Sequence, residues 1–133
     1  MKIKNTLICV MLSITLALVA CKDDNDFVPK PTSEMVEHVS DVVGILQQDE
    51  LNGGMWFIYY HVPGTIDSVI RYYPTSLSKS ILNLRNEDQY GFRWVRFSGD
   101  VYENDNLNRN YICDEYYTVV LTEIEGTTRP QKF

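Results

Sequence analysis

The feature that most constrains the fold of this 133-residue chain is a succession of short apolar runs separated by turn signals. Asn52-Gly53-Gly54 and Pro63-Gly64 separate the first three runs, and Asn-Gly between two apolar runs is the strongest short-range signal for a β-hairpin. The runs, rich in β-branched and aromatic residues, are 38–47, 55–62, 68–73, 91–101 and 112–124. Each is long enough for one strand, so the pattern predicts an all-β domain of five strands.

A single short helix is predicted between the third and fourth strands. Leu77, Ile81 and Leu84 are spaced i, i+4 and i+7, so they share one face of a helix, and Ser76 is the expected N-cap. Pro74 ends the preceding strand because it has no N–H to donate. The order of three strands, one helix and two strands is that of an OB-fold, a five-stranded Greek-key barrel. An open five-stranded sheet packed on one helix is the alternative.

Two glycines lie inside predicted strands. Gly44 and Gly99 are each expected to mark a β-bulge or a sharp bend, because glycine in a strand interior commonly does so. Val95, Phe97 and Val101 alternate along the fourth strand, so they are expected to face the barrel interior together.

Residues 1–20 have the three parts of a secretory signal peptide: two lysines near the start, an apolar stretch, and small or aliphatic residues before position 21. The apolar stretch is shorter than the roughly 20 residues that a helix needs to cross a hydrocarbon core. Leu18-Val19-Ala20-Cys21 resembles the lipobox of bacterial lipoproteins. This resemblance implies cleavage before Cys21 and a lipid on its thiol, and two or three acyl chains anchor a protein stably to a membrane.

Lys22-Asp23-Asp24 follows the cysteine at once. This stretch resembles the export signal of Bacteroidetes surface lipoproteins, which implies an outer-membrane anchor with the domain displayed outside the cell. An ordinary solvated linker, with the domain on the periplasmic side, is the alternative. Residues 21–37 are polar and contain two prolines, so they are predicted to form a flexible tether. An OB-fold-like domain is expected over 38–126 and a C-terminal tail over 127–133.

The charge of the chain argues against a nucleic-acid partner. The whole sequence has a formal net charge of −6, and removal of residues 1–20 leaves 10 basic and 18 acidic side chains. Proteins that bind phosphate backbones usually carry a basic face, because counterion release supplies most of their non-specific affinity.

The sequence has no spacing typical of a catalytic or metal site. His38 and His61 are its only histidines, and neither stands in a metal-binding motif. Cys113 is the only cysteine of the predicted domain, so no disulfide can form within it, and a buried strand position is expected. The acidic stretch 100–106 lacks the order of a calcium loop, and Asp114-Glu115 would face opposite sides of a strand. We therefore expect no enzyme activity, metal or cofactor.

Three tyrosine doublets lie in predicted strands: Tyr59-Tyr60, Tyr72-Tyr73 and Tyr116-Tyr117. Neighbouring strand residues face opposite sides, so one member of each doublet is expected inside the barrel and the other outside. OB-folds commonly bind extended ligands on the face of strands two and three. The candidate ligand-binding residues on the outside of these strands are Phe57, Tyr59, Arg71 and Tyr73. Tyrosines beside an arginine suit a sugar or a protein partner, whereas the alternative is that they only pack across strands.

Four motifs follow one another along the chain: Gly53-Gly54-x-Trp56-x-Ile58, Tyr72-x-Pro74-x-x-Leu77, Val95-x-Phe97-Ser98-Gly99-x-Val101 and Val119-x-Leu121-x-x-Ile124. This succession resembles the single-domain OB-fold lipoproteins of Bacteroidetes related to the NigD-like group, over most of residues 42–125. The motifs consist of core apolar residues and turn glycines. The resemblance therefore implies a fold and an envelope location and marks no catalytic residue. Residues 85–94 are bulkier than the entry to the fourth strand in that family.

Together these patterns favour a lipid-anchored, non-enzymatic envelope lipoprotein that acts as a binding or accessory module for a protein or a glycan. A structural envelope protein with no small ligand is the alternative. Oligonucleotide binding rests on fold analogy alone and is opposed by the acidic charge.

Overall fold

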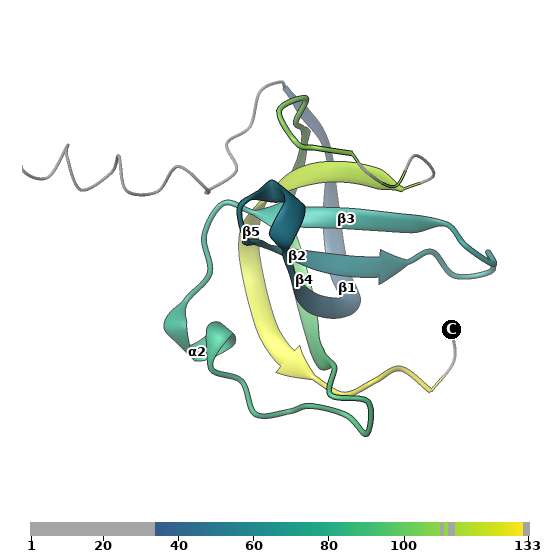
Figure 1. Cartoon of the computed structure of the whole chain (residues 1–133), viewed down its shortest axis with the longest axis vertical. Helices are drawn as coiled ribbons and strands as arrows, with labels where there is room; N and C mark the ends of the chain where they lie inside the picture. The colour runs from purple at the N-terminus through teal and green to yellow at the C-terminus, as the bar shows by residue number, and fades with distance from the viewer. Residues whose placement is uncertain (1–33, 110, 112–113, 132–133) are drawn as a thin grey trace, which may run out of the picture.

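The structure is a computed structural model that describes residues 34–109, 111 and 114–131. The predicted signal peptide, Cys21, most of the predicted tether and Cys113 lie outside the described residues. The described elements follow in the order β1 (Met35–Asp49), η1 (Glu50–Asn52), β2 (Met55–His61), β3 (Val69–Pro74), α2 (Lys79–Leu82), β4 (Arg93–Glu103) and β5 (Glu115–Thr127) (Figure 1). β1 thus begins three residues before the predicted run, and β5 is shifted three residues toward the C-terminus.

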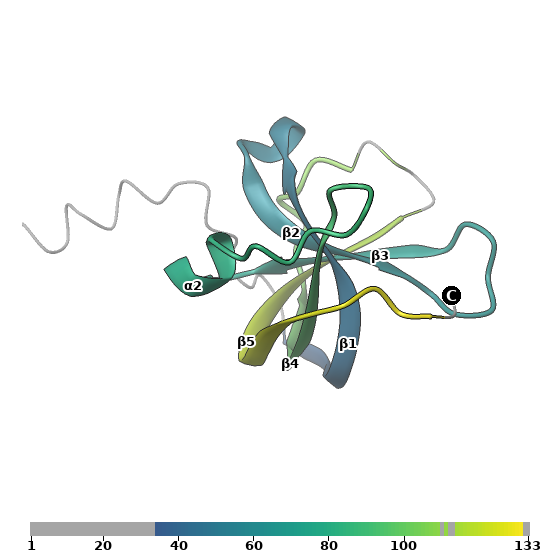
Figure 2. The ribbon, with the colours of Figure 1, turned by 90° about the horizontal axis from the view of Figure 1, so that it is seen from below.

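The five strands close into a barrel in the order β1-β2-β3-β5-β4. All neighbouring strands are antiparallel except β3 and β5, which are parallel. α2 and the turn between β2 and β3 lie on opposite sides of this barrel (Figure 2). The described residues confirm the predicted all-β class with an OB-fold-like element order, and the closed barrel excludes the open sheet.

The barrel interior is filled by side chains that alternate along the strands. The buried members of this core are Leu46, Ile58, Tyr72, Ile81, Val95, Phe97, Val101 and Val119. The Tyr72 ring meets Phe97 edge-on with centroids 5.1 Å apart, and Tyr60 and Tyr117 pack beside it. One member of each tyrosine doublet therefore faces inward, as strand alternation predicts.

The predicted helix is present, but its N-cap is Ser78 and not Ser76. The Ser78 Oγ accepts a hydrogen bond from the Ile81 N–H at 3.4 Å, and α2 has only four residues, so its first turn starts later than the apolar spacing suggested. The apolar face is confirmed, because Leu77, Ile81 and Leu84 all pack against the barrel core.

The two strand glycines have different roles. Gly99 lies at a register shift between β4 and β5, so the predicted bulge is confirmed. Of the bulge or bend expected at Gly44, the bulge is wrong, because the register shifts between β1 and β4 lie at Met35–Glu37 and at Val39–Val42, where Asp41 has a φ of 53°. Gly44 instead lets β2 approach closely: a Cβ there would lie 2.6 Å from the Tyr59 carbonyl oxygen.

We predict that Gly44→Ala destabilises the barrel by about 1–3 kcal/mol, because the added methyl group would meet backbone that cannot move aside. Gly126→Ala is the matched control, since the atoms nearest to its Cβ are the flexible methyl groups of Leu84. Urea denaturation of the purified protein measures both. Equal midpoints for the two variants would contradict this account of Gly44.

Candidate functional site

The four predicted ligand-binding residues lie together on the outer side of β2 and β3. The strands place Tyr59 directly opposite Arg71, with Phe57 and Tyr73 on the same side of the sheet. However, Phe57 is 3% exposed, Tyr73 is 0% exposed and Arg71 is 9% exposed. These three residues are therefore on the predicted outer side of the strands but covered, whereas Tyr59 is half-buried. Whether a ligand reaches the three covered side chains stays a prediction.

The cover comes from the connection between β4 and β5. Leu107 of this connection packs with Phe57, Tyr73 and Tyr116, and we call these four residues the outer aromatic cluster. The rings of Tyr73 and Tyr116 are stacked, with centroids 6.2 Å apart and an interplanar angle of 13°. Leu107 is the one signal in the sequence that could have revealed this cover, because it is an apolar residue within a polar loop.

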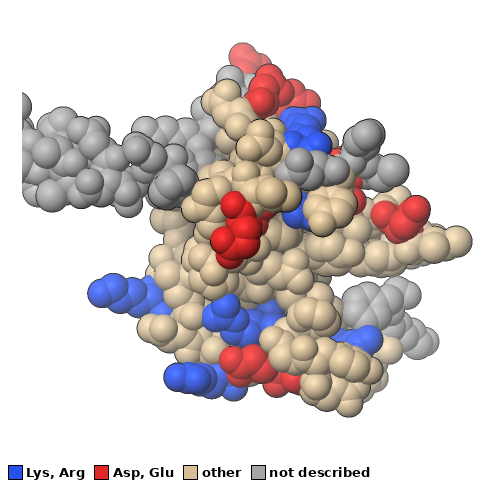
Figure 3. All heavy atoms as spheres, viewed as in Figure 1, with Lys and Arg blue, Asp and Glu red and all other residues tan. Residues whose placement is uncertain are grey.

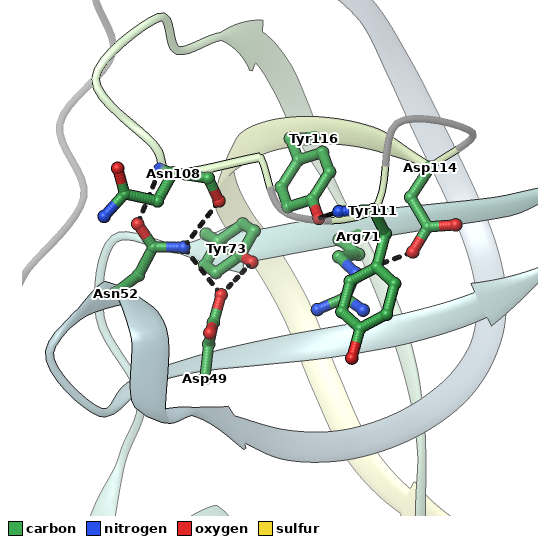
Figure 4. A network of polar contacts seen from close by, with 8 residues as sticks. All are labelled: Asp49, Asn52, Arg71, Tyr73, Asn108, Tyr111, Asp114 and Tyr116. Carbon is green, nitrogen blue, oxygen red and sulfur yellow. Dashed lines mark hydrogen bonds and ion pairs between the residues drawn. The ribbon is translucent and has the colours of Figure 1, made fainter.

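Arg71 is held beside this cluster by charge and by aromatic rings. Its Nε donates a hydrogen bond to Asp114 Oδ2 at 2.9 Å (Figure 4). The guanidinium lies 4.7 Å from the centre of the Phe57 ring, 4.6 Å from that of Tyr111 and 5.3 Å from that of Tyr116. A guanidinium at such distances is attracted by the ring faces. Arg71 is therefore engaged by its own chain.

A buried polar network ties η1 to the same connection (Figure 4). Asn52 Oδ1 accepts from the Asn108 N–H at 2.7 Å, and Asn52 Nδ2 donates to the Asn108 carbonyl at 3.0 Å. Asn52 Nδ2 also donates to Asp49 Oδ2 at 2.7 Å, and the Tyr73 hydroxyl donates to the same oxygen at 2.6 Å. The loops that flank the ligand face in OB-folds are thus joined across it.

The network shifts the pKa values of the two groups at its centre, Asp49 and Tyr73. Burial acts to raise the pKa of Asp49, but hydrogen bonds from Tyr73, Asn52 and the Leu51 N–H outweigh it and hold that pKa below its ordinary value. Burial and the Asp49 carboxylate raise the pKa of the Tyr73 hydroxyl well above its ordinary range. Tyr73 therefore remains a donor and Asp49 an acceptor at neutral pH.

A second feature, the β1–β2 groove, is open. β1 pairs with β4 from Met35 to Leu46 but with β2 only from Ile45 to Asp49, so β1 and β2 separate beyond the Ile45–Tyr59 pair. The groove has a volume of about 320 Å³. Its lining is mainly aromatic, aliphatic and proline side chains: Val42, Val43, Ile45, Tyr59, Tyr60, His61, Pro63, Trp94 and Pro130, with Ser40 and Asp41 as the other polar residues.

One row of outward side chains connects the covered face with the open groove. Strand register places Trp94, Ile45, Tyr59, Arg71 and Tyr116 directly beside one another, in that order, across β4, β1, β2, β3 and β5. Arg71 and Tyr116 are covered, whereas Trp94, Ile45 and Tyr59 border the groove; of these three, Ile45 and Tyr59 are half-buried and Trp94 is only 3% exposed. Of the four predicted ligand-binding residues, Tyr59 alone therefore lines an open surface.

Two of the groove side chains are oriented by hydrogen bonds. Trp94 Nε1 donates to Asp88 Oδ2 at 2.9 Å, and this bond, with others from the backbone of Phe92 and Tyr90, holds the pKa of Asp88 below its ordinary value. His61 Nε2 lies 3.2 Å from the Ile66 carbonyl oxygen. His61 is thus a strand residue beside a turn, as the sequence indicated.

A further hollow, the β4–β5 groove, adjoins the first. It has a volume of about 490 Å³ and is lined by Asp41, Arg96, Phe97, Ser98, Thr122, Glu123, Ile124 and Glu125. Arg96 forms an ion pair with Glu125, with Nη1 and Oε1 3.3 Å apart. Asp41 lines both grooves, so they meet at the bulge of β1.

The acidic stretch 100–106, which begins within β4, does not assemble around one point. Asp100 pairs with His38, whose Nδ1 is 2.7 Å from its Oδ1, and Asn104 is buried and donates to Thr118 Oγ1 at 2.8 Å. Among the described residues, no group of three or more His, Cys, Asp or Glu side chains is placed to hold a metal ion.

Comparisons with protein-family models and with curated proteins find no match for this chain. Within the described ranges, no helix has the length and apolar character needed to cross a membrane. The fold and the site define a class of protein: a small OB-fold-like barrel whose usual ligand face is covered by its own loop, with two adjoining grooves along β1, β2, β4 and β5.

We predict that Asp49 makes the stability of the barrel depend on acid pH. Because its pKa is lower in the folded state than its ordinary value of 3.8, its contribution is complete above that pH and is lost as the pH falls through the folded value. Asp49→Asn should therefore flatten the fall in thermal midpoint below about pH 4. Asp105→Asn, which alters a carboxylate with 87% of its side chain exposed, is the control and should retain the fall. A wild-type profile in Asp49→Asn would count against the network.

Proposed function

We propose that the chain is a lipid-anchored, non-enzymatic module of the bacterial outer envelope that binds a protein or a glycan. The lipobox-like sequence ending at Cys21 supports the anchor, and Lys22-Asp23-Asp24 supports display on the cell surface. The resemblance to the NigD-like lipoproteins supports the same location. The anchored domain is a barrel on a polar tether, an arrangement that suits capture of a partner near the membrane.

The observation that supports binding most directly is the open, aromatic-lined β1–β2 groove. Ligand pockets commonly have volumes of about 300–1,000 Å³ and combine an apolar lining with a few polar groups. This groove lies within that range and presents Tyr59 and Trp94 beside Asp41 and His61. Rigid aromatic rings give a large contact area at little conformational cost, which favours them in binding surfaces.

The covered face supports a second candidate, a structural envelope protein without a small ligand. The outer aromatic cluster and Arg71 are engaged by the chain itself, so the usual OB-fold surface is a packing surface here. That cover also opposes oligonucleotide binding on this face. On the side of the molecule in Figure 3, Lys and Arg side chains are scattered among acidic and uncharged ones and form no continuous basic stripe.

We predict that a C-terminal tag on the full chain is removed by protease added to intact cells. Cys21→Ala should release the chain from the membrane fraction, because the lipid thioether cannot form. Immunoblotting of shaved cells and of membrane fractions measures both. Protection of the tag until the outer membrane is opened would refute surface display and leave the periplasmic alternative.

We predict that Tyr59→Ala weakens partner capture about tenfold or more, because Tyr59 is the half-buried ring between the covered face and the groove. Tyr102→Ala is the control, since Tyr102 is also half-buried but lines neither groove. Cross-linking on intact cells and binding to a glycan array provide the readouts, with the unfolding midpoint measured for both variants. Full capture by a folded Tyr59→Ala protein would exclude this groove as the binding surface, and no capture by the unaltered chain would favour the structural candidate.

A further inference from the structure

The two grooves form one surface that crosses β2, β1, β4 and β5. Asp41 lines both, and its backbone N–H donates to Ser98 Oγ of the β4–β5 groove at 3.0 Å. Register continues across the boundary, because Val43 of the first groove lies opposite Arg96 of the second, which lies opposite Glu125. A ligand that fills the first groove therefore has a direct path along the surface into the second.

The lining of this surface is acidic. Three carboxylates line it, those of Asp41, Glu123 and Glu125, against the single guanidinium of Arg96, which Glu125 already engages. In the part of the chain that the structure describes, Asp41 and Glu123 form no salt bridge. Arg129 precedes the groove residue Pro130, but its guanidinium lies 5.3 Å from the centre of the Tyr90 ring. The surface thus suits a positively charged ligand.

The spacing of the grooves suits an extended chain. One groove centres on β1 and β2 and the other on β4 and β5, so their centres are about two strand spacings, or roughly 10 Å, apart. In a polyproline II helix, residues i and i+3 face the same side and lie about 9 Å apart. Grooves lined by aromatic side chains are a common way of reading this conformation.

We propose that this surface docks an extended, basic segment of a partner protein in the polyproline II conformation. An apolar side chain of the segment occupies the β1–β2 groove beside Tyr59 and Trp94. A Lys or Arg side chain three residues away enters the β4–β5 groove and pairs with Asp41 and Glu123. This inference rests on the proposed binding function and names the chemistry of its partner. A neutral glycan has no charged group to match the second groove.

The test measures binding of a fluorescein-labelled peptide in which one leucine and one lysine are separated by two prolines. The mature lipidated chain in detergent micelles is titrated, and fluorescence anisotropy gives the affinity. Asp41→Asn and Glu123→Gln should each weaken binding about threefold to fivefold at low salt, as expected for exposed ion pairs. Arg96→Gln should strengthen it by a similar factor, because it removes the competing cation. These differences should shrink near 1 M salt, where charges are screened beyond about 3 Å.

Matched controls separate the charge effect from damage to the fold. Glu50→Gln removes an exposed carboxylate on η1 that lines neither groove, and it should leave the affinity unchanged. Asparagine tolerates the positive φ of Asp41, so Asp41→Asn preserves the bulge, and circular dichroism checks this. A peptide with glutamate in place of lysine should bind at least fivefold more weakly. It loses the ion pair with Asp41 and Glu123, and its own carboxylate is repelled by theirs.

Two results would overturn the proposal: no binding of the lysine peptide at millimolar concentration, or an affinity that does not respond to Asp41→Asn and Glu123→Gln. Binding of maltoheptaose that Tyr59→Ala abolishes, together with no binding of the peptide, would reject the basic partner and leave the binding function intact. Undiminished capture on cells by folded Tyr59→Ala protein would reject the β1–β2 groove as the binding surface and with it this proposal, whereas no capture by the unaltered chain would reject the binding function itself.

Discussion

The parallel pairing of β3 with β5 is the constraint on which the rest of the molecule depends. It closes the barrel, and it places Tyr72 beside Tyr117 and Tyr73 beside Thr118, with Arg71 beside Tyr116. Because β5 is anchored there, the connection that precedes it must cross the outer side of β2 and β3. Leu107, Asn108 and Asp114 then meet Tyr73, Asn52 and Arg71. The strand that closes the barrel is thus directly preceded by the connection that covers the usual ligand face.

The alternation of tyrosines divides the molecule into two packed layers. Tyr60, Tyr72 and Tyr117 belong to the barrel core, while Tyr73 and Tyr116 belong to the outer aromatic cluster, with Tyr59 packed against it. The outer layer ends at Tyr59, because β1 and β2 separate just beyond it and no described residue of the β4–β5 connection lines the groove there. The open surface therefore begins where the covered one stops, and Tyr59 lies at the boundary.

Features that depend on local chain chemistry were predictable. The Asn-Gly turn, the five strands, the apolar face of Leu77, Ile81 and Leu84, and the bulge at Gly99 follow from turn propensity, alternation and spacing. The bulge near Asp41 and the cap at Ser78 were missed. Each is set by what its backbone meets across the fold: Ser98 Oγ accepts the Asp41 N–H, and the helix begins where Ile81 can reach the core.

By itself, the sequence determined the succession of strands and helix along the chain and which side of each strand its aromatic residues occupy, because strand alternation is a property of the backbone. It also contained the lipobox-like segment that supports the proposed location, and the acidic charge that opposes a nucleic-acid partner. Only the tertiary structure decided which outward side chains meet solvent. Exposure depends on what distant segments cover, so Phe57, Arg71 and Tyr73 became packing residues, whereas Val43, Ile45 and Tyr59 are half-buried and line the open groove.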